Sequence, residues 1–435
     1  MIQATQCTWD DVGPELTGPL KGLRVIDFTI AWAGPMTTRS LAYLGAAVIK
    51  VEAPGRPDPW RAGYLDATPE RFPGFDPGLR PYNRNVFFNT QSHDKWSLSL
   101  DLKAKGGVEV AQRLARDADV IIANFSPGVL DRLGVGYDAL SAVNPKVIVV
   151  EMPAFGVGGP MAGHVAMGKS MEAANGMASL IGYGDGRPVL TGSAYLDPIG
   201  GLNATVAVLM ALHQRGRTGE GTRVEVAQTE SAAHWIGEYL LEELYRGVGD
   251  LPDGNHVPNA APHDAYPCKG DDEWIAIAVR SEDEWHGLCA VMGRGDLARD
   301  ARYASVASRL RFNAELDGQI AAWTSMQDKE DAAVALQDAG VPAAPVNNGR
   351  DISGDPALRA AGFVARLDHP DAGPHEYPAL PYHLERTRGS MRRAAPLFGE
   401  HNLQVLAGIL GLAESEIAAL YESGAVTDEP WPGTW

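Results

Sequence analysis

A strand–helix–strand pattern near the N-terminus constrains the fold of this chain more than any other feature. An apolar run from Leu23 to Phe28 predicts a short strand, and a helical pattern follows from about Met36 to Leu44. Gly45 ends that helix, and residues 47–52 predict a second strand. A strand, a helix and a strand within about thirty residues form a βαβ unit, whose two strands are parallel. The sequence therefore predicts an α/β fold.

The same alternation continues along the first two hundred residues. The pattern predicts a helix over about 104–116 and strands at 120–123 and 147–151, whereas residues 53–94, rich in Pro, Gly, Arg and aromatics, are predicted to form a long surface loop. Ligands of open α/β sheets gather at the carboxyl ends of the strands. We therefore expect binding loops after the first strand and at 124–134. The AGP turn after the first strand lacks the GxGxxG pattern, so a dinucleotide site is only weakly indicated.

The length of the chain predicts more than one domain. Its 435 residues exceed what one hydrophobic core usually organises. From residue 225 the pattern becomes more helical, residues 254–279 predict a hairpin, and VPAAPV at 341–346 resembles a hinge-like connector. A second, smaller α+β domain is therefore expected over residues 225–345.

Charge and cysteine content exclude several classes of protein. The formal net charge of -18 argues against nucleic-acid binding and against anionic membranes as partners. Three cysteines lie far apart and form no metal-binding motif, so neither a disulfide framework nor a metal site is expected. No apolar run reaches membrane-spanning length, and the first residues lack the pattern of a signal peptide. These features predict a soluble cytoplasmic protein.

The segment from Gly182 to Asn203 contains the candidate catalytic residue. Asp197 lies between Leu196 and Pro198, ahead of Gly200, Gly201 and an apolar, helix-like run. One interpretation is structural, because aspartate commonly N-caps a helix. The other is functional, because the glycines would allow a ligand to approach this carboxylate closely. The local sequence alone favours the structural interpretation.

Several ordered stretches of the chain resemble the class III CoA-transferases, the family of formyl-CoA transferase and carnitine CoA-transferase. The resemblance runs from about Gly22 to Leu406 and includes GLRVIDFTIAWAGP, LSLDLKAKGG, ADVIIANFSPGVLDRLGVGY, GDGRPVLTGSAYLD, RTGEGTRVEVA and APLFGEHN. It implies a large Rossmann-like domain, with a parallel sheet, built from both chain ends. Residues 1–224 would form its first part, 225–345 the small domain, and 346–435 a segment that returns to the large domain. It also implies an interlocked homodimer.

The resemblance assigns roles to particular residues. Asp197 matches the family nucleophile, which forms an anhydride with the acyl group and then a thioester with CoA. Covalent catalysis of this kind divides one difficult exchange into easier steps. CoA and acyl-CoA would be substrates, with no permanently bound cofactor. The positions that match CoA-binding residues of the family are Trp32, Ala33, Leu100, Lys103, Asn124, Phe125 and Arg132.

Two positions depart from formyl-CoA transferase and bear on the substrate. Position 32 is Trp instead of Gln, and position 168 is Gly where that enzyme has a glutamate near its substrate. The loop at 254–262 also lacks that enzyme's glycine run. We therefore expect neither formate nor oxalate as the acid, but a bulkier apolar or aromatic acid, with succinyl-CoA as a possible donor.

Three alternatives stay open at the level of the sequence. An α-methylacyl-CoA racemase shares this fold, but it needs a histidine where this chain has Met167, and His164 is three residues away from that position. The chain could instead be one subunit of a heteromeric transferase. A nicotinamide dehydrogenase is disfavoured by the missing glycine fingerprint.

Overall fold

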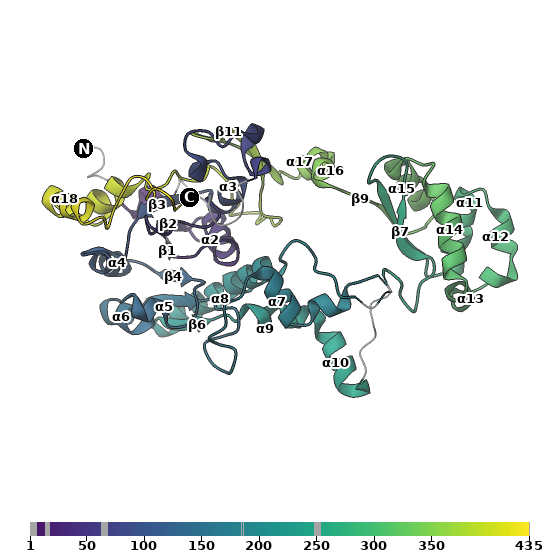
Figure 1. Cartoon of the computed structure of the whole chain (residues 1–435), viewed down its shortest axis with the longest axis horizontal. Coiled ribbons are helices and arrows are strands. Elements are labelled where there is room, and N and C mark those ends of the chain that lie inside the picture. The colour runs from purple at the N-terminus through teal and green to yellow at the C-terminus, as the bar shows by residue number, and fades with distance from the viewer. Residues whose placement is uncertain are drawn as a thin grey trace. The chain divides into compact units, whose positions relative to one another are not determined.

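The computed structural model describes residues 7–13, 18–61, 68–183, 185, 187–247 and 254–434 (Figure 1). These residues form two compact units. The larger unit combines Met1–Ala178, Leu190–Gly249 and Gly362–Trp435, and the smaller one combines Ser179–Val189 and Asp250–Ala361. Both ends of the chain therefore belong to the larger unit.

The larger unit is built around a six-stranded parallel sheet with the strand order β3-β2-β1-β4-β5-β6. Its strands are β1 (Arg24–Asp27), β2 (Ala47–Glu52), β3 (Lys95–Ser99), β4 (Val120–Ala123), β5 (Ile148–Glu151) and β6 (Thr222–Glu225). This is the strand order of the doubly wound Rossmann fold. The predicted α/β class and its parallel sheet are confirmed.

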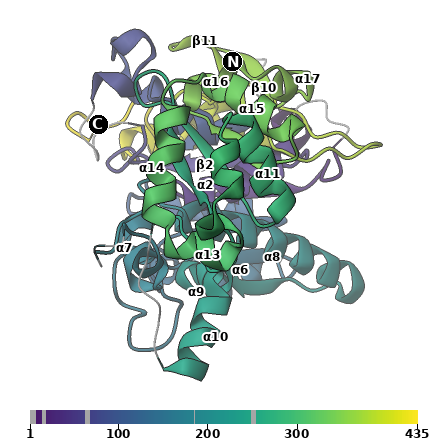
Figure 2. The same cartoon turned by 90° about the vertical axis from the view of Figure 1, so that its right-hand side faces the viewer.

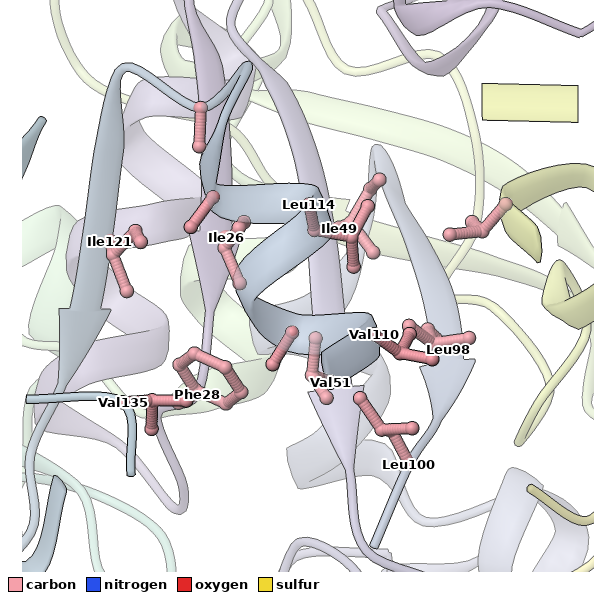
Figure 3. Packing of buried hydrophobic residues seen from close by; sticks show 14 of the residues in the cluster. Ile26, Phe28, Ile49, Val51, Leu98, Leu100, Val110, Leu114, Ile121 and Val135 are labelled. Carbon is pink, nitrogen blue, oxygen red and sulfur yellow. The ribbon is translucent and has the colours of Figure 1, made fainter. Parts of the chain in front are cut away.

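Alternate residues of the central strands are buried on opposite faces of the sheet. Ile26, Ile49 and Ile121 point into one hydrophobic cluster, shown in Figure 3, whereas Val25 and Val48 belong to a second cluster. The side chains of a strand alternate between its faces, and a parallel sheet needs both faces covered. Because both faces of the sheet are buried, its strands are almost continuously apolar in the sequence.

Helices from different parts of the chain cover the two faces. On the face of the second cluster lie α2 (Ala33–Tyr43) and α8 (Leu196–Thr218), with residues such as Leu41 and Val208 buried. The first cluster receives side chains from α4 (Gly107–Ala115), α5 (Val129–Arg132), α6 (Tyr137–Val143), η8 (Gln404–Ile409) and α18 (Glu414–Glu422). The larger unit also contains α1 (Trp9–Val12), α3 (Val86–Ser92), α7 (Gly168–Ala174), α9 (Gln228–Ala233), α10 (Gly237–Arg246) and the hairpin of β10 (Val364–His369) and β11 (Gly373–Pro378).

The C-terminal segment, as described over residues 362–434, contributes no strand to this sheet but covers its β3 edge. The His401 N–H donates to the Ser97 carbonyl at 3.0 Å, and the Ser99 N–H donates to the Asn402 side chain at 2.9 Å. In Figure 1 this segment is yellow and runs beside β3. Backbone groups at that edge, which would otherwise be open to pairing with another chain, are thus occupied.

The prediction of a long surface loop over residues 53–94 is wrong for much of its described part. Arg61 is fully buried, forms an ion pair with Glu52 at 2.9 Å and stacks on Phe88 at 3.7 Å. Phe88 belongs to helix α3. The polar and Pro/Gly-rich composition of the segment predicted solvent exposure. Arg61 is instead buried, and its contacts connect this segment to β2 and α3.

The smaller unit has its own sheet and its own core. Strands β7 (His263–Pro267), β8 (Trp274–Ala278) and β9 (Ala343–Val346) form an antiparallel sheet in that order. Its core is covered by helices that include α11 (Glu282–Val291), α12 (Gly295–Arg299), α13 (Val306–Arg311), α14 (Asn313–Thr324) and α15 (Lys329–Asp338), of which Figure 2 shows α11, α14 and α15. The short helices α16 (Gly349–Gly354) and α17 (Pro356–Ala360) complete the unit.

Two features of the smaller unit differ from the sequence-based expectation. Residues 341–346 are not a hinge-like connector, because β9 pairs with β8 over Ala343–Val346. The bounds of the units also differ from the predicted boundaries after residues 224 and 345. Helices α9 and α10 group with the larger unit, where α9 packs against α8, and residues 346–361 group with the smaller one.

Helix α8 is long and apolar enough to satisfy the length and composition of a membrane span. One such helix is weak evidence, because a core helix of a soluble protein meets the same criteria. Ala204, Val208 and Ala211 of α8 are buried in the second cluster, against the sheet. We therefore describe α8 as a covering helix of the α/β unit.

Candidate active site

Asp197 lies in the first turn of α8, at the carboxyl edge of the parallel sheet. Helix α8 ends at Thr218 and β6 begins at Thr222, so the C-terminus of the helix lies at the amino ends of the strands. Its N-terminus therefore points toward their carboxyl ends, where doubly wound proteins bind ligands. Asp197 is not the N-cap, because that position belongs to Tyr195. The capping interpretation of Asp197 is therefore wrong.

The paired glycines after Asp197 serve helix packing rather than ligand access. A Cβ on Gly201 would lie 2.5 Å from the Ala33 carbonyl oxygen, and one on Gly200 would lie 3.0 Å from the Gln228 side chain. The Thr37 hydroxyl, in α2, donates to the Gly201 carbonyl at 2.9 Å. Glycine is needed here because α2 and α8 approach too closely for any side chain. Gly201, one helical turn after Asp197 in α8, thus packs against the start of α2.

The carboxylate of Asp197 has a close neighbour but no polar partner. A Cβ on Gly168, the first residue of α7, would lie 2.4 Å from Asp197 Oδ2. Among the residues that the structure describes, none forms a hydrogen bond or an ion pair with this carboxylate, which is partly exposed. Leu196 and Ile199 beside it pack into a small apolar cluster with Met171 and Ala232. The Asp197 carboxylate is therefore partly removed from water, and no cation or hydrogen-bond donor of the described residues offsets its charge.

This environment changes the acidity of Asp197. Burial, together with the nearby charge of Glu172, raises the pKa of Asp197 from 3.8 to about 7. Both causes act in the same direction, because low polarity and a second negative charge each disfavour the ionised form. A carboxylate with a raised pKa is a stronger base and a stronger nucleophile once it is ionised.

Two loops flank the topological switch point of the sheet, between β1 and β4. Asn124, directly after β4, accepts from the Ile30 N–H and donates to the Ile30 carbonyl, both at 2.9 Å. Asp58 accepts from the Ala31 N–H at 3.1 Å and pairs with the buried Lys50 at 2.9 Å. Ala31 has a φ of +60°, which a non-glycine residue seldom adopts. The loop before α2 is thus fixed in a strained conformation, as is common at functional sites.

A buried charge network lies directly below this loop. Asp27, the last residue of β1, pairs with Lys95 at 3.0 Å and accepts from the Thr38 hydroxyl at 2.6 Å. Burial disfavours its ionised form, but Lys95 and Lys50 outweigh burial and lower the pKa of Asp27 to about 2. The charges are thus mutually satisfied, and they rigidify the strand ends rather than act on a substrate.

The seven residues predicted to bind CoA follow the carboxyl ends of β1, β3 and β4. Lys103 and Arg132 are exposed, and no acid pairs with either of them in the described part of the chain. The side chain of Asn124 is occupied by the Ile30 backbone, and that of Leu100 is buried in the core. Each can therefore contribute backbone rather than side chain. Ala33 is buried, whereas Trp32 and Phe125 are half-buried.

The structure brings in residues that the sequence analysis did not single out. Trp32 lies 5.5 Å from Trp60, and Trp60 lies 5.2 Å from Phe87, between ring centroids. The guanidinium of Arg71 lies 5.0 Å from the centroid of Phe87. We call the rings of Trp32, Trp60 and Phe87 the aromatic row. The aromatic content of residues 53–94 was visible in the sequence, but its convergence on Trp32 depends on the folding of that segment around Arg61.

Two other features are not candidates for the catalytic centre. His256, Asp264 and Asp317 of the smaller unit could present three metal-ligating atoms, but Tyr266 donates to Asp317 at 2.6 Å and Asn255 donates to Asp264 at 2.8 Å. The carboxylates therefore already have protein partners. A cavity of about 480 Å³ lies at the opposite, amino edge of the parallel sheet, where it is lined by residues such as Arg24, Lys146 and Arg215.

Comparison with known proteins is consistent across sequence and structure. A family model described as CoA-transferase family III matches residues 20–402. A formyl-CoA:oxalate CoA-transferase of Bradyrhizobium sp. (strain ORS 278) is 32% identical, with 94% of this chain and 98% of the relative covered. A succinyl-CoA–D-citramalate CoA-transferase of Chloroflexus aurantiacus is 31% identical, with 92% and 96% covered. A CaiB/BaiF family protein from Brucella suis superimposes with a TM-score of 0.81 at 29% identity, with 90% and 99% covered.

Proposed function

Because this chain belongs to CoA-transferase family III, we propose that it transfers CoA from a thioester to a carboxylic acid with Asp197 as the covalent nucleophile. The observation that carries the proposal is the state of that carboxylate. It is partly exposed, has no hydrogen-bond or ion-pair partner among the described residues, and has a pKa raised to about 7. An aspartate that caps a helix would instead accept backbone hydrogen bonds.

The proposed steps balance without any cofactor. A carboxylate oxygen of Asp197 attacks the thioester carbonyl, the carbon–sulfur bond breaks, and an acyl–aspartyl anhydride and CoA thiolate form. The thiolate attacks the aspartyl carbonyl, so that the donor acid leaves and an aspartyl–CoA thioester remains. The acceptor carboxylate then attacks the carbonyl of this thioester, the carbon–sulfur bond breaks, and a second anhydride and CoA thiolate form. The thiolate attacks the acceptor's carbonyl in that anhydride, which gives the acceptor's CoA thioester and releases the Asp197 carboxylate. Each step exchanges one carboxylate or thiolate leaving group for another.

CoA is proposed to bind along the carboxyl ends of the strands. Lys103 and Arg132 are exposed cations without acidic partners in the described residues, and they follow β3 and β4. Such groups suit phosphate oxygens, with arginine giving forked contacts and lysine a point charge. In a chain with a net charge of -18, an anionic substrate requires cations of this kind at its binding site.

The acid is proposed to be larger and less polar than formate or oxalate. The relatives named above act on different acids, so the family does not fix this choice. The aromatic row offers rings near the N-terminus of α2, and Gly168 adds no side chain next to Asp197. Aromatic faces favour apolar or ring-containing groups. We propose succinyl-CoA as the donor and an apolar or aromatic acid as the acceptor.

Racemase chemistry needs a second acid–base group beside Asp197. Met167 occupies the expected position, and a thioether transfers no proton. His164 is exposed, with Nδ1 3.2 Å from the Met161 carbonyl. The charge of Glu172 acts on Asp197 and raises its pKa, but three hydrogen bonds occupy the two oxygens of Glu172. The transferase assignment therefore fits the site better.

The active assembly is proposed to be an interlocked homodimer in the cytoplasm. Helix α10 buries none of its residues within the chain and exposes apolar side chains that include Leu240, Leu241 and Leu244. Helix α8 also exposes Val206 and Met210. Exposed apolar surface of this extent commonly marks a subunit contact. The free, buried thiols of Cys268 and Cys289 accord with a reducing compartment.

The test is substitution of Asp197 with a matched control. Asp138 occupies the same first-turn position in α6 and is exposed, so Asp138→Ala should leave transfer unchanged. Asp197→Ala should lower kcat at least about a thousandfold while the protein stays folded. Donors and acids are screened by mass spectrometry of the CoA products.

A second experiment traps the covalent intermediate. Hydroxylamine or borohydride added with acyl-CoA should modify Asp197. An unmodified Asp197 peptide, or an Asp197→Ala enzyme that remains active, would refute the covalent route.

A further inference from the structure

Glu172 is a fully buried carboxylate that the transfer chemistry described above does not use. It lies on α7, and both its oxygens accept hydrogen bonds from the segment that leads into α8. The Tyr195 N–H and the Thr191 hydroxyl each donate to Oε1 at 2.7 Å, and the Thr191 N–H donates to Oε2 at 3.3 Å. No cation pairs with Glu172 among the described residues. A buried charge held only by neutral donors is costly and calls for an explanation.

The three hydrogen bonds fix the backbone immediately before the nucleophile. Tyr195 is the N-cap of α8 and lies two residues before Asp197. Ala194, between the two anchored residues, has a φ of +50°, a conformation that needs external support. Anchoring Thr191 and Tyr195 to Glu172 supplies that support. The direction in which α8 begins, and with it the position of Asp197, depends on these contacts.

The same carboxylate also lies close to the nucleophile. Gly168 contacts Asp197 Oδ2 and is four residues before Glu172 on α7. Residues four apart in a helix lie on one face, one turn apart. Glu172 and Asp197 are therefore about one helical turn from each other, on the same side of α7.

Other charged groups around α7 do not offset this pair. Lys169 and Glu230 are exposed, on α7 and on the adjoining α9 respectively. His164, on the segment before α7, is exposed and hydrogen-bonded to Met161. None of the three forms an ion pair with Glu172 or Asp197 within the described part of the chain. Met171 of α7 packs with Leu196 and Ile199 of α8 and with Ala232 of α9 in an apolar cluster.

We propose that Glu172 is a positioning residue for catalysis: it fixes the start of α8 and keeps a second negative charge beside the attacking carboxylate. This inference rests on the proposed function of Asp197. Its consequence is an Asp197 that is more basic, and therefore more nucleophilic, than an isolated aspartate in the same place.

Glu172→Gln separates the charge from the anchoring. Glutamine retains an oxygen at Oε1, which accepts the two short hydrogen bonds, and loses only the long contact to the Thr191 N–H. We expect the acidic midpoint of the pH profile of kcat/KM to fall by about one pH unit, the order expected for two charges one turn apart in a partly solvated site. The plateau above that midpoint should also fall several-fold. Glu230→Gln removes the same charge from an exposed position and should change neither quantity.

Two outcomes would overturn the inference, and both differ from a failure of the proposed function. An unchanged midpoint in folded Glu172→Gln would make Glu172 merely structural. If that variant does not fold, Thr191→Val decides, because it keeps the charge and removes one anchoring donor. It should lower kcat several-fold at an unchanged midpoint, and a kcat within twofold of wild type would contradict the positioning role. Absence of Asp197-dependent transfer in the wild type would instead refute the proposed function.

Discussion

The environment of Asp197 couples catalysis to stability in one side chain. Its pKa of about 7 in the folded protein lies above the ordinary value of 3.8. The folded state therefore holds a proton that the unfolded state releases between about pH 4 and pH 7. Stability contributed by this site is lost as the pH rises through that range, and above pH 7 the ionised carboxylate weighs against the fold. The form that attacks a thioester is thus the form that the fold tolerates least.

Asp197→Asn should accordingly be more stable than the wild type only at high pH. An amide of the same shape carries no charge, so we expect its free energy of unfolding at pH 8 to rise by at least ~1 kcal/mol, and its Tm by a few degrees. Below about pH 4 both proteins carry a neutral group and should unfold alike. Urea unfolding at pH 8 and pH 4 measures the difference. A gain of equal size at both pH values would contradict a raised pKa.

Substitution of Gly168 should displace the nucleophile and lower activity, although less than loss of Asp197 itself. The Cβ of Gly168→Ala would meet Asp197 Oδ2 and the Ala194 Cβ, both at 2.4 Å, so the carboxylate must move. A displacement of about 1 Å should reduce kcat roughly 10- to 100-fold. Gly163→Ala is the matched control, because nothing lies within 4 Å of its added Cβ. Steady-state kinetics compare the two variants. Equal activities would mean that the added methyl group of Gly168→Ala does not displace the Asp197 carboxylate.

At the scale of elements, the contact between α2 and α8 connects the loop before α2 to the nucleophile. Gly201 contacts Ala33 and Met36, so the start of α2 and the first turns of α8 cannot move independently. Trp32 lies directly before α2, and Asp197 lies one turn before Gly201. The distance between the aromatic row and the carboxylate is therefore set by two helices packed backbone to backbone.

Two glycines of α8 should respond oppositely to alanine. Gly201→Ala introduces a Cβ 2.5 Å from the Ala33 carbonyl oxygen and should destabilise the protein by about 1–3 kcal/mol. Gly216→Ala, in the same helix, meets nothing within 4 Å and should stabilise it by up to about 1 kcal/mol through helix propensity. Urea denaturation of both variants measures the contrast. Equal effects would mean that α2 and α8 are not closely packed in solution.

Elements with strong local signals could be predicted from the sequence, and those that depend on distant partners could not. The apolar runs at β1, β2, β4 and β5 show their burial directly, and the family resemblance singled out Asp197 as the candidate nucleophile. Strand β9 was not predicted, because Ala343–Val346 has no strong strand pattern of its own and is recognised as a strand by its pairing with β8. Glu172 was missed for a similar reason. A glutamate in a helical pattern looks solvated until Thr191 and Tyr195 are seen to donate to it.

At the scale of the whole molecule, the exposed apolar face of α10 bears on the proposed dimer. We expect the purified chain to sediment as a dimer, and Leu240→Asp with Leu244→Asp to reduce the dimer fraction, because two charges would enter the contact. Val334→Asp, at an equally exposed apolar position of α15, is the control. An interlocked pair should also keep its mass on dilution. A monomeric wild type would favour a sister subunit as partner.

Packing of the last seventy residues against the first hundred has a consequence for how the protein is made. Leu406 and Leu420 complete the cluster that covers Ile26, Ile49 and Leu98. On the ribosome, this face of the nascent N-terminal sheet is therefore only partly covered, by α4, α5 and α6, until translation has nearly finished. The intervening smaller unit, with a core of its own, can fold meanwhile. Premature termination should therefore yield chains that chaperones hold and proteases clear, rather than a shortened enzyme.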